Sequence, residues 1–299
     1  MRPYVITTPC LNEIEALPRL LADLERQDHP AALWLVVDDG SDDGTRAWLA
    51  EQSATRPWME WRDSPEAADE YLGAHIARIK RWGLEQALAV ADDRGLEVFA
   101  AGVLDADLGL PADHYARLIG ALEADDALGV VSSVMGSEAG GAGPKERFQR
   151  ADLPRGATQT FRTSCLEAIG GLPPYPGYDG AANVKAAVRG WRCAALTDVV
   201  ASHARPTATR FGAATGYSRK GRYAWFLGHH PLLIAARTAA YTVTTPHSGG
   251  VHFLRGWLVS AARRDARCPD PDVRHHYGHE RPRQYLRGIL GRGPRWARD

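Results

Sequence analysis

Short apolar, β-branched runs alternate with helix-like stretches through the first half of the chain, and two of these runs end in acidic clusters. The run Leu33–Val37 leads into DDGSDDGT, which begins at Asp38, and Glu97–Leu104 leads into DADLGLP, which begins at Asp105. Apolar runs of this length predict buried parallel strands. The carboxyl ends of parallel strands share one edge of an open α/β sheet, where ligands bind. We therefore expect a doubly wound, mostly parallel α/β sheet with both clusters at its ligand-binding edge.

The rest of the chain predicts further elements and a change of character towards the C-terminus. Strands are expected at Tyr4–Thr8, Val130–Val134, Gln159–Phe161, Trp191–Ala195 and Val199–Ser202. Helices are expected at Ala74–Arg94, Pro111–Glu123, Ser164–Ile169, Ala181–Arg189, Tyr217–Leu227, Leu232–Val243 and Val251–Arg263. Only helices are predicted after residue 217, so we expect a C-terminal helical extension.

Bulk composition narrows the function. The 36 Lys and Arg residues balance the 36 Asp and Glu residues, which argues against nucleic-acid binding. The four cysteines form no CxxC pair, which argues against a disulfide framework or a zinc site. The N-terminus does not resemble a signal peptide, and no apolar run reaches the ~18–20 residues needed to span a bilayer. We expect a cytoplasmic protein with reduced thiols.

The two acidic clusters suggest a site for a nucleotide and a cation. In Asp105-Ala106-Asp107, one carboxylate can bind a hard cation that bridges diphosphate oxygens, and the other can bind a ribose hydroxyl. A solvated turn is the alternative for this tripeptide. Asp39 can accept a hydrogen bond from a nucleobase N–H. A helix cap formed by Asp42 or Asp43 is compatible with that role.

The end of the first predicted strand lies near the same crevice. Pro9 and Glu13 follow this strand, and we expect both to approach the nucleotide. Glu13 has an alternative role as an acidic residue in the first turn of the next helix, where the helix dipole favours it. Asn12 is expected to cap that helix.

Four motifs together resemble the family 2 glycosyltransferases of the GT-A fold: PCLNE from Pro9, VVDDGSDDGT from Val36, LDADLGLP from Leu104, and GWRC from Gly190. The resemblance extends to about residue 230. It implies that Asp39 contacts the base of a nucleotide sugar, with uridine as the first expectation for that base. It also implies that Asp105 and Asp107 contact the ribose and a Mg²⁺ or Mn²⁺ ion.

The same resemblance implies roles for further residues. Arg78 or Lys80 corresponds to a region that approaches the nucleotide, and Lys80 is our candidate. Some relatives use a histidine at the place of His203 as a metal ligand, and imidazole suits Mn²⁺ better than Mg²⁺. A structural histidine is the alternative for His203.

Inverting glycosyl transfer needs a carboxylate that accepts the proton of the acceptor hydroxyl. The candidate is Asp179 in GYDG, with a helix N-cap as its alternative role. A sugar nucleotidyltransferase normally carries a Gly-rich basic phosphate loop near its N-terminus, and PCLNE contains none. A transferase-like scaffold that binds nucleotide without turnover is the second alternative.

These expectations divide the chain by function. Residues 1–228 form the catalytic domain, with a nucleotide-binding half at 1–135 and an acceptor half at 136–228, and residues 229–299 form a basic helical extension. The cations of Arg205–Gly221 are expected to fold over the diphosphate, or to form a solvated loop. The apolar, arginine-flanked tail suits either peripheral contact with the inner face of an anionic membrane or packing on the protein. The resemblance favours a glycan, lipid-linked or cell-envelope acceptor.

Overall fold

The structure is a computed structural model of the 299-residue chain. It describes residues 1–65, 73–137, 153–203, 212–243 and 247–289. The chain forms two compact units, Met1–Arg205 and Pro206–Asp299. We describe each unit by itself.

The first unit is built on one eight-stranded sheet with the order β3-β2-β1-β4-β7-β6-β8-β5. The strands are β1 (Tyr4–Cys10), β2 (Leu33–Asp38), β3 (Met59–Asp63), β4 (Ala100–Val103), β5 (Leu108–Gly109), β6 (Leu128–Ser137), β7 (Thr160–Arg162) and β8 (Arg192–His203). The β3-β2-β1-β4 half and the β6-β8 pair are parallel, whereas β7 and β5 pair antiparallel to their neighbours. The expected mostly parallel α/β sheet is confirmed.

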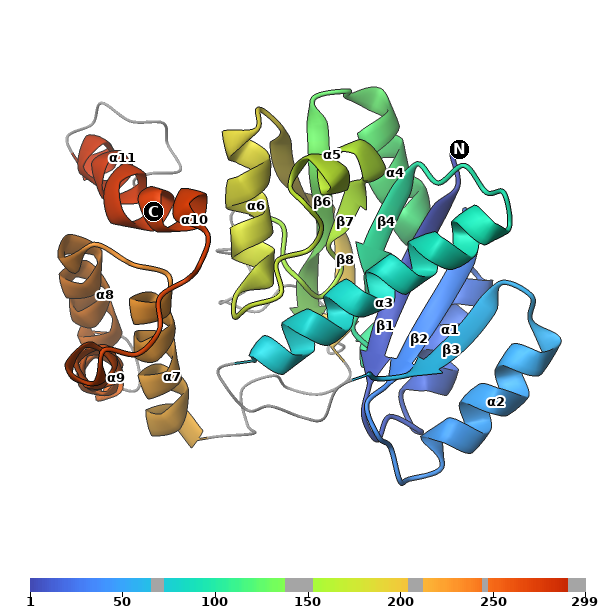
Figure 1. The fold of residues 1–299 in the computed structure, drawn as a ribbon, viewed down its shortest axis with the longest axis horizontal. Coiled ribbons are helices and arrows are strands. Elements are labelled where there is room, and N and C mark those ends of the chain that lie inside the picture. The colour runs from blue at the N-terminus through green and yellow to red at the C-terminus, as the bar shows by residue number, and fades with distance from the viewer. Residues whose placement is uncertain (66–72, 138–152, 204–211, 244–246, 290–299) are drawn as a thin grey trace. The chain divides into compact units, whose positions relative to one another are not determined.

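Helices cover both faces of this sheet (Figure 1). The helices of the first unit are α1 (Leu17–Glu25), α2 (Thr45–Thr55), α3 (Ala74–Asp93), α4 (His114–Ala124), α5 (Thr163–Ala168) and α6 (Tyr178–Val188). One core lies between the sheet and α3, α5 and α6, and a second lies on the opposite face with α1 and α4. The alternation of the strands explains these two cores, because successive side chains point to opposite faces. Val5 belongs to one core, and Tyr4 and Ile6 to the other.

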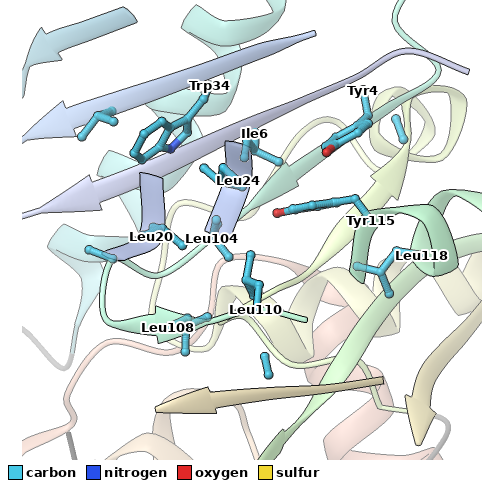
Figure 2. Close-up of a cluster of buried hydrophobic side chains, with 14 of the residues drawn as sticks. Tyr4, Ile6, Leu20, Leu24, Trp34, Leu104, Leu108, Leu110, Tyr115 and Leu118 are labelled. Atoms are coloured by element: carbon cyan, nitrogen blue, oxygen red, sulfur yellow. The ribbon is translucent and has the colours of Figure 1, made fainter. Parts of the chain in front are cut away.

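The core beneath β1 and β2 is rich in large side chains (Figure 2). Trp34 and Tyr4 are fully buried, and Tyr4 stacks on Tyr115 of α4 with 4.6 Å between ring centroids. The polar atoms of these rings have partners, because the Trp34 indole donates to Thr8 and the Tyr4 hydroxyl donates to the carbonyl of His29. Burial of such rings is favourable when their polar groups are satisfied, and it helps to hold β1 and β2 in the sheet.

Most predicted elements are confirmed to within a few residues. The sequence did not predict β3, β5, or the helices after residue 263, and one predicted pair of strands differs. The two strands expected at Trp191–Ala195 and Val199–Ser202 are a single strand, β8. The register between β6 and β8 shifts at Ser133/Val134, so the ladder continues past the polar Thr197-Asp198 pair that seemed to interrupt it. This irregularity is a bulge-like feature, in which β8 carries three residues, 197–199, that have no partner in β6.

The second unit consists of helices. They are α7 (Gly212–Phe226), α8 (Pro231–Val243), α9 (Gly249–Arg263), α10 (Pro271–His275) and α11 (Arg281–Ile289), with a π-helical turn, η1 (His276–Glu280), before α11. Helices α7 and α9 approach closely at glycines: a Cβ at Gly256 would lie 2.0 Å from the carbonyl oxygen of Ser218. This packing places α7 in the same compact unit as α9, so the unit begins at Pro206, before the 228/229 boundary expected from the sequence.

Candidate functional site

The carboxyl ends of three adjacent strands form the centre of the site. Strand β1 lies between β2 and β4, and Cys10 at its end is in register with Asp38. Asp39 follows β2, and Asp105 follows β4 by two residues. Because β1 alone separates them and strands are spaced by about 4.8 Å, the two strand ends lie about 10 Å apart on one edge. That span suits a ligand the size of a nucleotide, as the two acidic motifs predicted.

The loops after β1 and β2 are bonded to each other. The amide N–H of Asn12 donates to the Ser41 hydroxyl at 2.9 Å, and the Asn12 side-chain oxygen accepts from the Asp42 amide at 2.9 Å. Asn12 has a left-handed backbone, with φ at 58°, which asparagine tolerates better than most residues. Asn12 therefore ties the two strand ends together and does not cap α1, whose N-cap residue is Ala16.

Asp43 completes this connection. Its carboxylate accepts from the Thr45 amide at 3.0 Å, from the Thr45 hydroxyl at 2.6 Å, and from the Ile14 amide at 3.2 Å. Desolvation alone would raise the pKa of Asp43, but these hydrogen bonds lower it below its ordinary value. The helix cap expected at Asp42 or Asp43 is wrong, because the N-cap residue of α2 is Gly44, and Asp43 instead stabilises the turn that precedes the helix. Glu13 precedes α1 by several residues, so its alternative role in the first turn of that helix is wrong.

The neighbouring carboxylates Asp38 and Asp39 differ in environment. The Asp38 side chain is fully buried and accepts from the Ser41 amide, which holds the turn after β2. Asp39 is partly exposed, and both of its oxygens lie within hydrogen-bond distance of His75 Nε2. Asp39 therefore has the better access to a ligand, as expected of the base contact. Pro9 is buried within β1 and faces Val37 in the register.

Lys80 of α3 is bound to the second acidic cluster. Its ammonium lies 2.5 Å from Asp105 Oδ1 and 2.6 Å from the Tyr178 hydroxyl, and it donates to the carbonyl of Gly156 at 3.2 Å. Burial alone would lower the pKa of Lys80, but the negative charge of Asp105 and the hydrogen bonds raise it above its ordinary value. Lys80 is therefore a buried, charged partner of Asp105.

Asp179 also binds the backbone of Gly156, the residue to which Lys80 donates. It lies in the first turn of α6, one residue after Tyr178, and its Oδ2 accepts from the Gly156 amide at 3.3 Å. The N-cap residue of α6 is Gly177, so the alternative role of Asp179 as an N-cap is wrong. A Cβ at position 156 would lie 2.2 Å from the Tyr178 hydroxyl, so glycine is required for this close approach. The backbone of Gly156 thus joins Lys80, through its carbonyl, and Asp179, through its amide N–H.

Strand pairing brings the backbone of His203 close to the backbone next to Asp107. The chain turns at Ala106 and enters β5, where Leu108 is in register with His203 of β8. The backbone of the expected imidazole ligand therefore lies beside the residue that follows Asp107. In the described part of the chain, no cluster of three His, Cys, Asp or Glu side chains could hold a metal ion by itself. This donor set fits a cation that substrate phosphates help to bind, because Mg²⁺ is commonly held by one or two carboxylates plus phosphate oxygens.

The sequence analysis missed two residues of this site, His75 and Tyr178. Tyr178 carried one signal, its place beside Asp179, whereas nothing in the sequence connects His75 with Asp39. Arg78 lies in α3 and is half-buried. Of the cations expected to cover a diphosphate, Arg205 and Arg210 lie outside the described residues, and Arg219 and Lys220 belong to α7 of the second unit.

Comparisons with known proteins identify the family and the fold of the chain. A sequence profile of glycosyl transferase family 2 matches residues 5–169, more than half of the chain. The undecaprenyl-phosphate mannosyltransferase of Micrococcus luteus is 36% identical over 118 residues, which are 40% of this chain and 43% of that protein. The chain thus spans less than half the length of this relative in the match.

Solved structures resemble the fold over most of its length. The mannosyltransferase PcManGT from Pyrobaculum calidifontis, in complex with GDP-Man and Mn²⁺, has a TM-score of 0.61 at 20% identity over 89% of this chain and 88% of its own. S. aureus TarS 1-349 in complex with UDP-GlcNAc has a TM-score of 0.58 at 15% identity over 99% and 89%. The fold is therefore GT-A, and the profile match shows that the chain belongs to glycosyl transferase family 2.

Proposed function

We propose that this chain transfers a glycosyl group from a nucleoside diphosphate sugar to an acceptor hydroxyl, with inversion at the anomeric carbon. The observation that carries the proposal is the pair of hydrogen bonds at Gly156, whose carbonyl accepts from Lys80 and whose amide N–H donates to Asp179. A residue suited to the donor and a carboxylate suited to the acceptor are thereby held by the two peptide groups that adjoin Gly156. Inverting transfer needs such a pair, because the nucleophile attacks the face opposite to the leaving diphosphate.

The donor is bound by the strand ends. Asp39 accepts a hydrogen bond from the nucleobase, near Pro9 and Glu13. Asp105 accepts a hydrogen bond from a ribose hydroxyl. Lys80 holds the Asp105 carboxylate in place through their 2.5 Å contact. Asp107, with His203, would hold a Mg²⁺ or Mn²⁺ ion together with the diphosphate. Such an ion supplies charge neutralisation for the leaving diphosphate.

Asp179 acts on the acceptor. Its two oxygens accept from the amides of Gly156 and Gly180, which fix the carboxylate without neutralising its charge. A fixed, ionised carboxylate can accept the proton of the attacking hydroxyl, as a general base does. We propose that the acceptor is a glycan or a lipid-linked or cell-envelope molecule, which the name of the M. luteus relative supports.

The transfer proposal is tested with Asp179→Asn, which keeps the size of the side chain and its acceptor oxygen. We expect release or transfer of sugar from a nucleoside diphosphate sugar with Mn²⁺ to fall by about 10²-fold or more, because general-base catalysis contributes about that much. Nucleoside diphosphate affinity should stay near wild type. Asp126→Asn, at a fully exposed side chain, is the matched control. Undiminished turnover by Asp179→Asn would overturn the role of Asp179.

We also propose that the second unit contacts an anionic membrane surface. Residues 199–264 contain nine Lys and Arg and no Asp or Glu. Val243 of α8 and Val251 and Leu258 of α9 are 76%, 65% and 50% exposed. In the described residues no helix has the length and apolarity to cross a bilayer. Exposed apolar side chains among cations suit an interfacial position, in which the helix lies in the plane of the membrane.

Vesicle co-sedimentation tests the membrane proposal. The intact protein should sediment with vesicles that contain an anionic phospholipid, and less with purely zwitterionic ones. Val251→Asp combined with Leu258→Asp should release it, because two carboxylates replace apolar contacts at an anionic surface. Val188→Asp, at a 54% exposed valine of α6, is the matched control. Equal sedimentation of the double variant and the wild type would rule out this surface.

A further inference from the structure

His75 is in direct contact with Asp39, the carboxylate that we propose to bind the nucleobase. It is the second residue of α3, and its Nε2 lies 2.9 Å from Asp39 Oδ1 and 2.8 Å from Asp39 Oδ2. A carboxylate only accepts hydrogen bonds, so Nε2 carries the hydrogen in this contact. The residue is 9% exposed, and its Nδ1 is buried with no hydrogen-bond partner among the described residues. The imidazole is therefore held by packing and by Asp39.

The nearly equal distances show which part of the carboxylate His75 uses. A nitrogen equidistant from both oxygens lies between them, where their inner lone pairs converge. The inner positions are the ones that bind a fork of two parallel donors. With His75 there, each oxygen of Asp39 keeps only its outer lone pair, and these outer lone pairs point away from each other. A nucleobase that reaches Asp39 can therefore donate to only one outer lone pair at a time, and not to both oxygens as a fork.

The nucleobases differ in what they present to such a carboxylate. The edge of guanine offers two parallel donors, the ring N1–H and the exocyclic amino group, and these fit an open carboxylate fork. The edge of uracil offers one donor, N3–H, between two carbonyl oxygens. A single outer lone pair of Asp39 satisfies the uracil donor but leaves one guanine donor unpaired. An unpaired donor in a buried site weakens binding strongly.

We propose that His75 determines the base specificity of the donor site: by occupying the fork of Asp39 it makes the site select uridine over guanosine nucleotides. The inference rests on the proposed function and assigns its donor class. His75 acts through Asp39, so it is a positioning residue. Its substitution should therefore change the ratio of the affinities for uridine and guanosine nucleotides. A merely structural role would not change this ratio.

Calorimetric titration of the full chain with UDP and with GDP, both with Mn²⁺, tests the proposal. We expect the wild type to bind UDP about ten-fold tighter than GDP, or more. In His75→Ala the fork of Asp39 is open, so the ratio should fall by about ten-fold, mainly through tighter GDP binding. Ile76→Ala, at the adjacent 39% exposed side chain of α3, should leave the ratio unchanged.

His75→Asn covers the case in which the alanine variant fails to fold. Its amide can donate to one oxygen of Asp39 at a time, so the ratio should again fall. An unchanged ratio in either folded variant would overturn the inference. Wild-type protein that binds GDP as tightly as UDP would also overturn it and would leave the proposed transferase function standing. Wild-type protein that binds neither nucleotide would overturn both.

Discussion

At the scale of single residues, Lys80 connects the donor and acceptor sides of the site. Its side chain is 3% exposed and is neutralised by Asp105, with the Tyr178 hydroxyl and the Gly156 carbonyl as further partners. A buried cation with three oxygen partners is stable only while its counter-charge is present. The pair therefore fixes the Asp105 carboxylate beside the predicted ribose position.

A double-mutant cycle measures this coupling. Lys80→Met should lower the free energy of unfolding by about 3 kcal/mol, because it leaves the half-buried Asp105 without its counter-charge. In the Asp105→Asn background the same substitution should cost about 1 kcal/mol less, because no uncompensated carboxylate remains. Urea unfolding of the four proteins gives both values. Strict additivity of the two substitutions would contradict an energetic link between Lys80 and Asp105.

The residues around the proposed nucleotide position show how far sequence analysis can predict such a site. Asp39 and Asp105 could be predicted because each directly follows an apolar strand, and strand order then brings their ends together. His75 and Tyr178 could not, because they meet Asp39 and Lys80 from helices 36 and 98 positions away. Contacts of this kind depend on where α3 and α6 sit against the sheet, which no local pattern encodes.

At the scale of elements, α3 is set against the sheet by a close contact at Gly83. A Cβ there would lie 2.4 Å from the Thr7 hydroxyl and 2.8 Å from Val37 Cγ2. The Thr7 hydroxyl cannot move freely, since it donates to the carbonyl of Leu35 at 3.1 Å. This contact sets the distance between α3, which carries His75 and Lys80, and the strands that carry the acidic clusters.

Two glycine-to-alanine substitutions distinguish the effect of this close contact on stability from the effect of helix propensity. Gly83→Ala should destabilise the protein by about 2 kcal/mol through overpacking. Gly120→Ala, inside α4 with open space at the Cβ position, should stabilise it by about 1 kcal/mol, because alanine favours the helix. Thermal or urea unfolding distinguishes the two. Stabilisation by Gly83→Ala would show that α3 is not held at this distance.

The elements also differ in how well the sequence predicts them. The helix expected at Ala74–Arg94 is confirmed as α3, since its apolar spacing and length are unambiguous. The antiparallel strand β7 inserts between β4 and β6, and although β6 precedes it directly in element order, β4 is separated from it by several elements. Its residues were predicted as a strand, but their place in the sheet depends on long-range pairing.

At the scale of the whole molecule, charge is distributed unevenly. Residues 1–205 carry 31 Asp and Glu against 20 Lys and Arg, whereas residues 206–299 carry 5 against 16. The two excesses cancel in the total, which is why net charge alone gave no hint of a partner. An acidic unit attracts a metal cation, and a basic one suits an anionic surface.

The acid stability of the protein should depend in part on His114. Burial of His114 in α4 lowers its pKa to about 4, against the opposing effect of Asp113. The unfolded chain takes up this proton near pH 6.5, so stability is lost as the pH falls from 6.5 towards 4. Between pH 6.5 and 5 the loss is about 2 kcal/mol.

His114→Leu should remove this part of the pH dependence. Urea unfolding at pH 7.5 and at pH 5 should show a decrease in stability that is about 2 kcal/mol smaller in the variant than in the wild type. All other titrating groups are common to both proteins, so they cancel in the comparison. The same decrease in both proteins would mean that His114 is not kept neutral by burial.

The central claim is that one nucleoside diphosphate spans the ends of β2 and β4. Calorimetric titration of nucleoside diphosphates with Mn²⁺ tests it most directly, in the wild type, in Asp39→Asn and in Asp105→Asn. We predict saturable binding by the wild type and a loss of about ten-fold or more in affinity for each variant, since each removes a charged acceptor. Undiminished affinity in both folded variants would contradict the claim that these two strand ends share one nucleotide.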